Sequence, residues 1–190
     1  MSVLDAITVE GSRWLARIAG AMVLFSAILV AAEVILRNLF GIVALYSFEL
    51  TIYLFAIAVA MALPHALAQR AHIRIDIVYA TLPLSVRAVL DVAALGAMVG
   101  VAGLFARHAF QTASTSYSLG ARSNDALQVP MALPQGVWAL ALSWFAVVAF
   151  ILLIQALADL SRSRYGMIAA RAGVPSADFL PDDEGGDGAR

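Results

Sequence analysis

The chain has 190 residues, of which 62% are hydrophobic and 13% are charged, whereas a typical soluble domain carries about 25% charged residues. A water-soluble core is therefore excluded as the basis of the fold. The absence of cysteine also excludes a disulfide framework and a thiolate metal or redox site, and the sequence has no basic patch with interleaved aromatics of the kind that binds nucleic acid.

Four runs without acidic or basic charges are the strongest signal in the sequence. They cover residues 18–32, 50–68, 92–106 and 133–158, and the first extends past Glu33 through Leu36; crossing the hydrocarbon layer takes roughly 20 helical residues. Backbone groups in lipid must bond within their own segment, and the runs lack the alternating polarity of a barrel. The predicted fold is an all-α integral membrane protein with four transmembrane helices, about 18–37, 48–68, 87–108 and 133–158, in a membrane domain of residues 18–160.

The arginines predict the orientation, because cytoplasmic loops carry an excess of positive charge. All twelve basic residues are arginines. One side would hold Arg13, Arg17, Arg70, Arg74, Arg87, Arg162, Arg164 and Arg171, and the other Arg37, Arg107 and Arg122. Both termini are therefore predicted to be cytoplasmic. The first run also resembles a cleaved secretory signal, but cleavage would leave three spans and reverse this charge pattern, so a retained helix is favoured.

Residues 1–17 precede the first span. Apolar side chains at positions 4, 7, 14, 15 and 18 share one helical face. This pattern predicts an amphipathic segment lying along the cytoplasmic surface, with Trp14 at headgroup depth. A frayed leader is the alternative interpretation.

The connection between the first two spans, residues 33–49, holds three charges. Glu33 and Arg37 are spaced i, i+4 with the acid first, the better order for a helical ion pair. The alternative is a helix end at the interface, with Arg37 reaching outward. Glu33 lies about one turn from the end of its span, too shallow for the midplane proton site of a small exporter. Ser47 is predicted to cap the second helix, and Glu49 to lie in its first turn.

Two histidines invite a haem interpretation, since a pair of histidines on neighbouring helices can ligate one iron. His65 lies near the inner end of the second span, just after Pro64, which is expected to kink or end the helix. His108 lies near the outer end of the third span. Counted along the spans, the two would be about 25 to 30 Å apart, which excludes a shared iron.

The connection between the second and third spans is predicted to be cytoplasmic. His72, Arg74 and Asp76 alternate with isoleucines, which is typical of an extended segment with one apolar side. In a helix, His72 and Asp76 would instead pair at i, i+4. Such a segment more often anchors to headgroups or to a neighbouring subunit than it catalyses a reaction.

The third span opens with Arg87 and Asp91, again i, i+4 but in the weaker order. It contains Gly96 and Gly100, a spacing that lets another helix approach closely, although alanine-rich sequences produce such spacings by chance. We take these two glycines as the candidate helix-packing face of the third span.

A polar periplasmic loop is expected after His108, followed by Pro130 before the fourth helix. Pro134 falls in the first turn of that helix, where proline is tolerated. Trp138 and Trp144 are expected toward its outer end. Residues 161–190 form a predicted cytoplasmic tail whose acidic end has nothing apolar to bury and should be disordered.

The sequence shows no phosphate-binding loop, no metal-ligand cluster, no catalytic triad and no midplane charge. A four-helix protein that carried a solute alone would need an intramembrane polar site. An accessory subunit is therefore favoured over an autonomous small exporter.

Six short motifs follow one another along residues 15–160. They are Glu33-Val-Ile-Leu-Arg37, Ser47-Phe-Glu49-Leu50, His72-Ile-Arg-Ile-Asp76, Leu82-Pro83, Arg87-Ala-Val-Leu-Asp91 and Leu127-Gln-Val-Pro130. Each is weak singly, but in this order and spacing the chain resembles the small, DctQ-like membrane subunit of tripartite ATP-independent periplasmic (TRAP) transporters. One departure is the lack of a further proline after Pro134, which many relatives carry.

The resemblance implies a multi-pass, non-enzymatic subunit of the bacterial inner membrane with no cofactor or metal of its own. Its expected partners are membrane lipid, a large multi-span permease subunit and a periplasmic binding protein that delivers an organic acid. Sodium coupling is expected in the large subunit, which this chain would brace. The alternatives are a cytochrome- or quinone-linked membrane anchor of an oxidoreductase and an autonomous exporter.

Eleven residues are candidates for structural or subunit-interface contacts. At the periplasmic side and in the third span they are Glu33, Arg37, Glu49, Pro130, Gly96 and Gly100. At the cytoplasmic side they are His72, Arg74, Asp76, Arg87 and Asp91.

Overall fold

The computed structural model describes residues 3–41, 46–69 and 82–162. These residues form four long helices: α1 (Val3–Phe40), α2 (Ser47–Ala68), α4 (Leu84–Ser118) and α5 (Ala132–Ser161). Each is long and apolar enough to cross a membrane. The predicted all-helical class with four spans is confirmed for this part of the chain.

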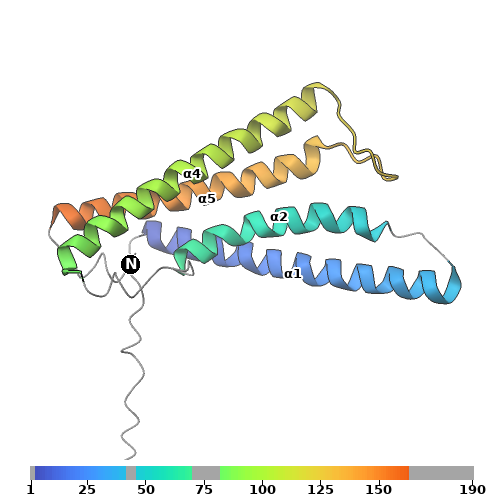
Figure 1. Cartoon of the computed structure of the whole chain (residues 1–190), viewed down its shortest axis with the longest axis horizontal. Coiled ribbons are helices and arrows are strands. Elements are labelled where there is room, and N and C mark those ends of the chain that lie inside the picture. Colours follow the sequence, from blue (N-terminus) through green and yellow to red (C-terminus); the bar gives the residue numbers. More distant parts are fainter. Residues whose placement is uncertain (1–2, 42–45, 70–81, 163–190) are drawn as a thin grey trace, which may run out of the picture.

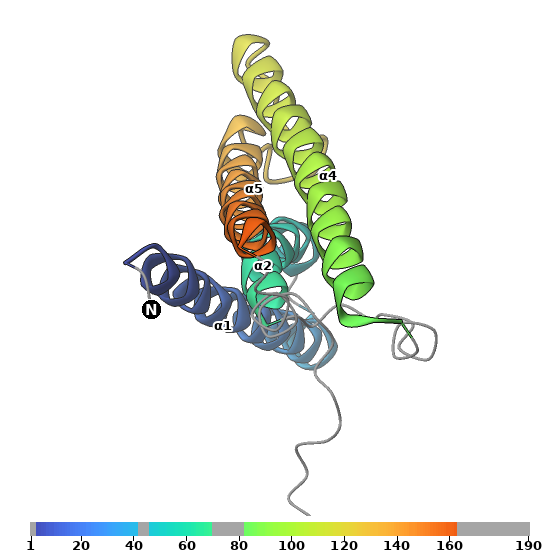
Figure 2. The same ribbon diagram turned by 90° about the vertical axis from the view of Figure 1, so that its left-hand side faces the viewer.

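The helices form two antiparallel hairpins, α1 with α2 and α4 with α5, that diverge toward one end (Figure 1). The hairpins are joined mainly through α2 and α5, which lie in the middle while α1 and α4 lie on the outside (Figure 2). We call the end that holds the α4–α5 connection, residues 119–131, the connection end. The short chain between consecutive helices accounts for the antiparallel pairs, but the pairing of α2 with α5 depends on side-chain packing.

α1 is one continuous helix of 38 residues. The described chain therefore has no break near residue 17, where the sequence predicted a boundary, and the surface placement of residues 1–17 stays a prediction. At 1.5 Å per residue the helix is about 57 Å long, almost twice the hydrocarbon thickness of about 30 Å. It ends at Gly41, whose φ of 67° is left-handed and whose N–H donates to the Arg37 carbonyl at 3.1 Å.

α4 extends further than the sequence predicted, whereas α2 ends at Ala68, where the sequence predicted its end. α2 continues through Pro64 to Ala68. α4 runs to Ser118, ten residues past His108, and a left-handed Gly120 closes it: the N–H groups of Gly120 and Ala121 donate to the carbonyls of Tyr117 and Ser116. The expected polar loop is therefore shorter, because its serine- and threonine-rich first part is helical.

Small side chains fill the interfaces between α2, α4 and α5. One cluster lies toward the end of the bundle away from the connection, a second in the middle and a third nearer the connection end. In that order their buried members are Ala88, Leu95 and Ala156; Leu67, Ala102, Phe145 and Ala149; and Ala60, Ala109, Ala139, Ala141 and Leu142. Lipid tails are as apolar as leucine, so close packing rather than hydrophobicity holds such helices together.

α1 contributes a stripe of small side chains at seven-residue intervals. Ser12, Ala19 and Ser26 are buried, and the next position in the series is Glu33. At one end of the stripe, a Cβ atom on Gly11 would lie 3.1 Å from the Trp144 ring, so α1 passes close to α5. Trp144 lies in the middle of α5, rather than toward its end as the sequence predicted.

Candidate functional site

Glu33 binds the start of the next helix. Its carboxylate accepts a hydrogen bond of 2.6 Å from the Ser47 backbone N–H, the first residue of α2. Ser47 is itself buried. The first N–H groups of a helix have no partner within the helix, so an acidic side chain there supplies both an acceptor and a favourable charge.

The predicted ion pair between Glu33 and Arg37 is not formed among the described residues. The i, i+4 spacing places the two charges near one another but does not fix the carboxylate, which is drawn to the N–H of α2. The predicted cap by Ser47 is also wrong. Ser47 is the first residue of α2, the N-cap position is Tyr46, and no side chain at that position caps the helix. Glu33, from the preceding helix, has that role.

We therefore expect Glu33→Ala to lower the thermal unfolding midpoint of the detergent-purified protein, because the Ser47 N–H loses its acceptor. Arg37→Ala should leave the midpoint nearly unchanged. Melting curves followed by circular dichroism at 222 nm check both variants. Equal losses in the two variants would contradict the capping role and favour the ion pair.

The α4–α5 connection has a compact fold of its own. Arg122 and Pro130 form an antiparallel bridge. Next to it, the Ser123 N–H donates to the Val129 carbonyl at 3.0 Å and the Val129 N–H donates to the Ser123 hydroxyl at 2.8 Å. The Ser123 hydroxyl donates in turn to Asp125. Pro130 thus lies at the base of a closed turn and is exposed.

Two side chains of α2 hold this turn. The Glu49 carboxylate accepts from the backbone N–H groups of Ala126 and Leu127 at 3.2 and 3.3 Å. One turn further along α2, the Tyr53 hydroxyl donates to Asp125 at 2.8 Å. We call this set, Glu49 and Tyr53 with Ser123, Asp125 and the N–H groups of 126 and 127, the loop clasp.

The loop clasp joins the two hairpins where they diverge. The connection extends from the tips of α4 and α5 toward the first turn of α2 (Figure 1). The sequence placed Glu49 correctly in the first turn of α2, but there its predicted role was only a favourable interaction with the positive end of the helix dipole. In the structure its carboxylate binds backbone groups 77 and 78 residues away.

Hydrogen bonds in the clasp stabilise the charged form of Asp125. The bond from Ser123, followed by those from Tyr53 and the Gln128 N–H, holds the pKa of the Asp125 carboxyl below its ordinary value of 3.8. A carboxyl whose pKa is lowered by folding contributes stability that is fully present above the unfolded pKa and is lost as the pH falls through the folded value.

We expect the amides of the α4–α5 connection to exchange faster with deuterium, after correction for intrinsic rates, as the pH falls below about 3.8. Protonation of Asp125 weakens the acceptor for Tyr53 and Gln128, which loosens the turn. In Asp125→Asn the corrected exchange should be fast already at neutral pH and depend little on acid. A wild-type protection that stays constant down to pH 2 would contradict this role.

The opposite end of the bundle places two carboxylates in the α4–α5 interface. Asp91 is 1% exposed and Asp159 is 5% exposed, next to the cluster of Ala88 and Ala156. The Arg87 Nε donates to the Leu82 carbonyl at 2.7 Å, just before α4 begins. Arg87, Asp91 and Asp159 all make polar interactions. The candidates His72, Arg74 and Asp76 lie outside the described residues.

Gly96 and Gly100 do not pack against another helix among the described residues. A Cβ atom on either glycine would meet nothing within 4 Å. The face of α4 that contacts α5 instead carries Ala88, Leu95, Ala102 and Ala109. The predicted packing face therefore has no helix against it among the described residues, and the glycines leave an open strip on α4.

The two histidines are closer in level than the sequence predicted. Ala60 of α2 and Ala109 of α4, the neighbour of His108, share one packed cluster. His65 is five residues after Ala60, so along the helix axis it lies only about 7.5 Å from the level of His108, at 1.5 Å per residue. The estimate of 25 to 30 Å assumed spans in full register, whereas α4 is longer and shifted. His108 lines a cavity between α2, α4 and α5 that His65 does not line. The described residues hold no group of three or more possible metal ligands.

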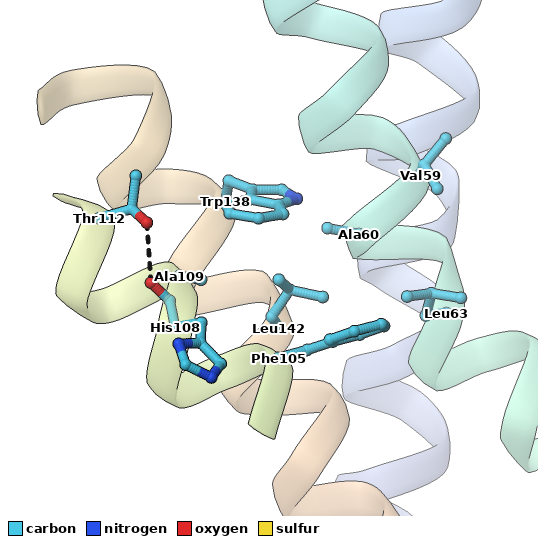
Figure 3. A pocket seen from close by; sticks show the side chains of 9 residues that line it. All are labelled: Val59, Ala60, Leu63, Phe105, His108, Ala109, Thr112, Trp138 and Leu142. Carbon is cyan, nitrogen blue, oxygen red and sulfur yellow. Dashed lines mark hydrogen bonds between the residues drawn. The ribbon is translucent and has the colours of Figure 1, made fainter. Parts of the chain in front are cut away.

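Two cavities lie along α2. One of about 310 Å³ is lined mainly by apolar side chains, with Val59, Ala60 and Leu63 from α2 facing Trp138 and Leu142 from α5 and Phe105 from α4 (Figure 3). His108 and Thr112 lie at its α4 edge, where the Thr112 hydroxyl donates to the His108 carbonyl at 2.9 Å. A second, of about 220 Å³, lies nearer the loop clasp and shares Trp138.

Sequence reasoning missed the loop clasp and the cap by Glu33. One signal was present for each: Gly120 marks a helix end ten residues after His108, and Glu33 continues the seven-residue series of Ser12, Ala19 and Ser26. No local pattern pointed from Glu49 to Ala126 or from Tyr53 to Asp125, because these partners are more than 70 residues apart.

One comparison with known proteins gives a match. The family model for the DctQ component of tripartite ATP-independent periplasmic transporters matches residues 26–162. The match runs from the middle of α1 to the end of α5 and covers more than half of the chain. No curated protein and no solved structure matches significantly.

Proposed function

This chain belongs to the DctQ family, the small transmembrane components of TRAP transporters of the inner membrane, and from that premise we propose that it braces the large permease subunit. One observation carries the proposal. The polar side chains placed by the structure at the connection end hold the chain's own turns, Glu33 at the start of α2 and Glu49 and Asp125 in the loop clasp. Glu33, Glu49 and Asp125 line neither of the two cavities along α2.

Solute carriage would require a different arrangement. A site for an organic acid needs cationic or N–H donor groups that converge in the membrane. The two cavities along α2 are instead lined mainly by apolar side chains, and their polar side-chain groups, from His108, Thr112, Tyr53, Gln135 and Trp138, include no arginine. We assign the substrate and sodium sites to the large subunit and the capture of the organic acid to the periplasmic binding protein.

The open strip on α4 supports a packing role toward the large subunit. Gly96 and Gly100 meet no side chain of this chain, and small residues let a second helix approach closely. The interface would be reached from the face of α4 opposite α5. Arg37 and Pro130, both exposed at the connection end, are further contact candidates.

The experiment is reconstitution of the parts. The chain, co-expressed with the large subunit of its transporter, should co-purify with it, and sodium-driven uptake of an organic acid into proteoliposomes should need both subunits and the binding protein. Uptake by vesicles that contain this chain alone, or a chain that never associates with the large subunit, would refute bracing.

We further propose that both termini face the cytoplasm, on the distribution of arginines. The chain has no cysteine, so single cysteines can be introduced without a prior cysteine-free variant. Thiols at Asn124 and at Ser161 should be labelled by an impermeant reagent from opposite sides of the membrane, Asn124 from the periplasm. Labelling of Ser161→Cys in intact cells with an opened outer membrane would reverse the topology.

A further inference from the structure

We propose that the two cavities along α2 form one groove that binds an acyl chain of a phospholipid with an amine headgroup. On α2 the groove is lined by Tyr53, Ala56, Ile57, Val59, Ala60 and Leu63. These positions recur at intervals of three and four residues and so share one side of the helix. Trp138 of α5 lines both cavities and connects them.

The dimensions suit a lipid chain and exclude a helix. Over a groove length of about 15 Å, a helix 10 Å in diameter displaces about 1,200 Å³, more than the two cavities of about 310 and 220 Å³ hold together. From Tyr53 to Leu63 the groove is about 15 Å long, ten residues at 1.5 Å. This length equals half of a hydrocarbon layer of about 30 Å, the depth of one leaflet.

The groove is continuous with the membrane-facing surface. All of its lining residues except Met131 belong to helices that can span the membrane. Val59 and Phe105, on its two sides, are 47% and 55% exposed, so the groove opens where α2 and α4 diverge. An apolar opening at that depth is filled by hydrocarbon, since water has no polar partners there.

The charges at the mouth select the headgroup. The Tyr53 hydroxyl, at the end of the groove, bonds to Asp125, and the Glu49 carboxylate lies one turn beyond. The buried Gln135 Oε1, which also borders the groove, has no hydrogen-bond partner among the described residues. An ammonium group is a pure donor and fits this set of acceptors.

An anionic headgroup fits less well. It would face the carboxylates of Glu49 and Asp125 at the mouth. The cation of the α4–α5 connection, Arg122, already donates to the Gln128 carbonyl at 3.3 Å. Arg37 lies in the last turn of α1, a helix that does not line the groove. Charge complementarity therefore favours phosphatidylethanolamine over phosphatidylglycerol.

Native mass spectrometry of the full chain, with equal amounts of phosphatidylethanolamine and phosphatidylglycerol added, tests the proposal. We expect one retained phosphatidylethanolamine per chain in preference to phosphatidylglycerol. Ala56→Phe fills the groove from an exposed position and should lower retention about tenfold, because excluding two methylene groups already has that effect. The control Ala97→Phe, on the exposed face of α4, should retain lipid as the wild type does.

Equal retention of the two lipids, or unchanged retention in an Ala56→Phe variant with a wild-type melting midpoint, would overturn the proposal. A second measurement does not depend on groove filling. With a photoreactive phenylalanine analogue at Val59 in the complex with the large subunit, we expect crosslinks to lipid. Crosslinks to the large subunit would show that protein side chains occupy the groove, and would refute the lipid site while leaving the bracing function intact.

Discussion

Replacing Ala102 with leucine is expected to lower the free energy of unfolding by about 3 kcal/mol, at the upper end for overpacked cores. Ala102 is 0% exposed and lies in the cluster where α2, α4 and α5 meet, with Leu67, Phe145 and Ala149. Three added carbons must separate α4 from α5, since the interhelical distance depends on the side chains at the contact. Unfolding in mixed micelles, followed by circular dichroism at 222 nm, measures the loss.

Ala97→Leu is the matched control on the same helix. Ala97 is exposed and lies about 140° around α4 from Ala102, given 100° per residue. The same added volume meets no neighbour there, so the change should stay within about 0.5 kcal/mol. Equal losses in the two variants would show that the effect comes from leucine in α4 itself rather than from the contact with α5.

Removing the Glu49 carboxylate from the loop clasp should make the α4–α5 connection more accessible to trypsin. In Glu49→Ala the N–H groups of Ala126 and Leu127 lose their shared carboxylate. We expect cleavage after Arg122 to become about tenfold faster, because hydrogen bonds to a charged acceptor stabilise by about 1.5 kcal/mol or more. Mass spectrometry of the two resulting fragments measures the rate, which reports local opening when reclosing is fast.

Two further variants delimit the effect. Tyr53→Phe removes one neutral donor at 2.8 Å from Asp125 and should accelerate cleavage less than Glu49→Ala does. Glu10→Ala breaks the exposed ion pair with Arg13 at 2.9 Å and should leave cleavage after Arg122 unchanged. If Glu10→Ala and Glu49→Ala accelerate it equally, the carboxylate of Glu49 does not hold the turn.

The loop clasp gives the proposed bracing role a physical basis. The two hairpins diverge toward the connection end (Figure 1), and there the clasp replaces direct helix packing with hydrogen bonds between α2 and the α4–α5 connection. A bilayer leaves such hydrogen bonds intact at the polar rim but offers no hydrophobic force between helices. Loss of the clasp should therefore change the angle between the hairpins before it unfolds them.

The sequence by itself determined the class of protein. Charge-free runs of spanning length predicted four helices, and the short connections predicted antiparallel neighbours, because both depend only on composition and length. The order of the motifs from Glu33 to Pro130 also indicated the family that the match over residues 26–162 shows. The sequence placed Glu33 and Glu49 correctly near the two ends of the α1–α2 turn.

Only the tertiary structure decided which faces and which polar groups meet. In membrane helices nearly every face is apolar, so the hydrophobic pattern does not mark the buried side, and Gly96 and Gly100 face outward while Ala102 is buried. Polar groups pair by distance in space: Glu33 binds Ser47 rather than Arg37, and Glu49 binds Ala126 and Leu127. Spacing along one helix determines which side chains can pair within that helix. Which pair forms depends on the other segment of the chain that packs next to it.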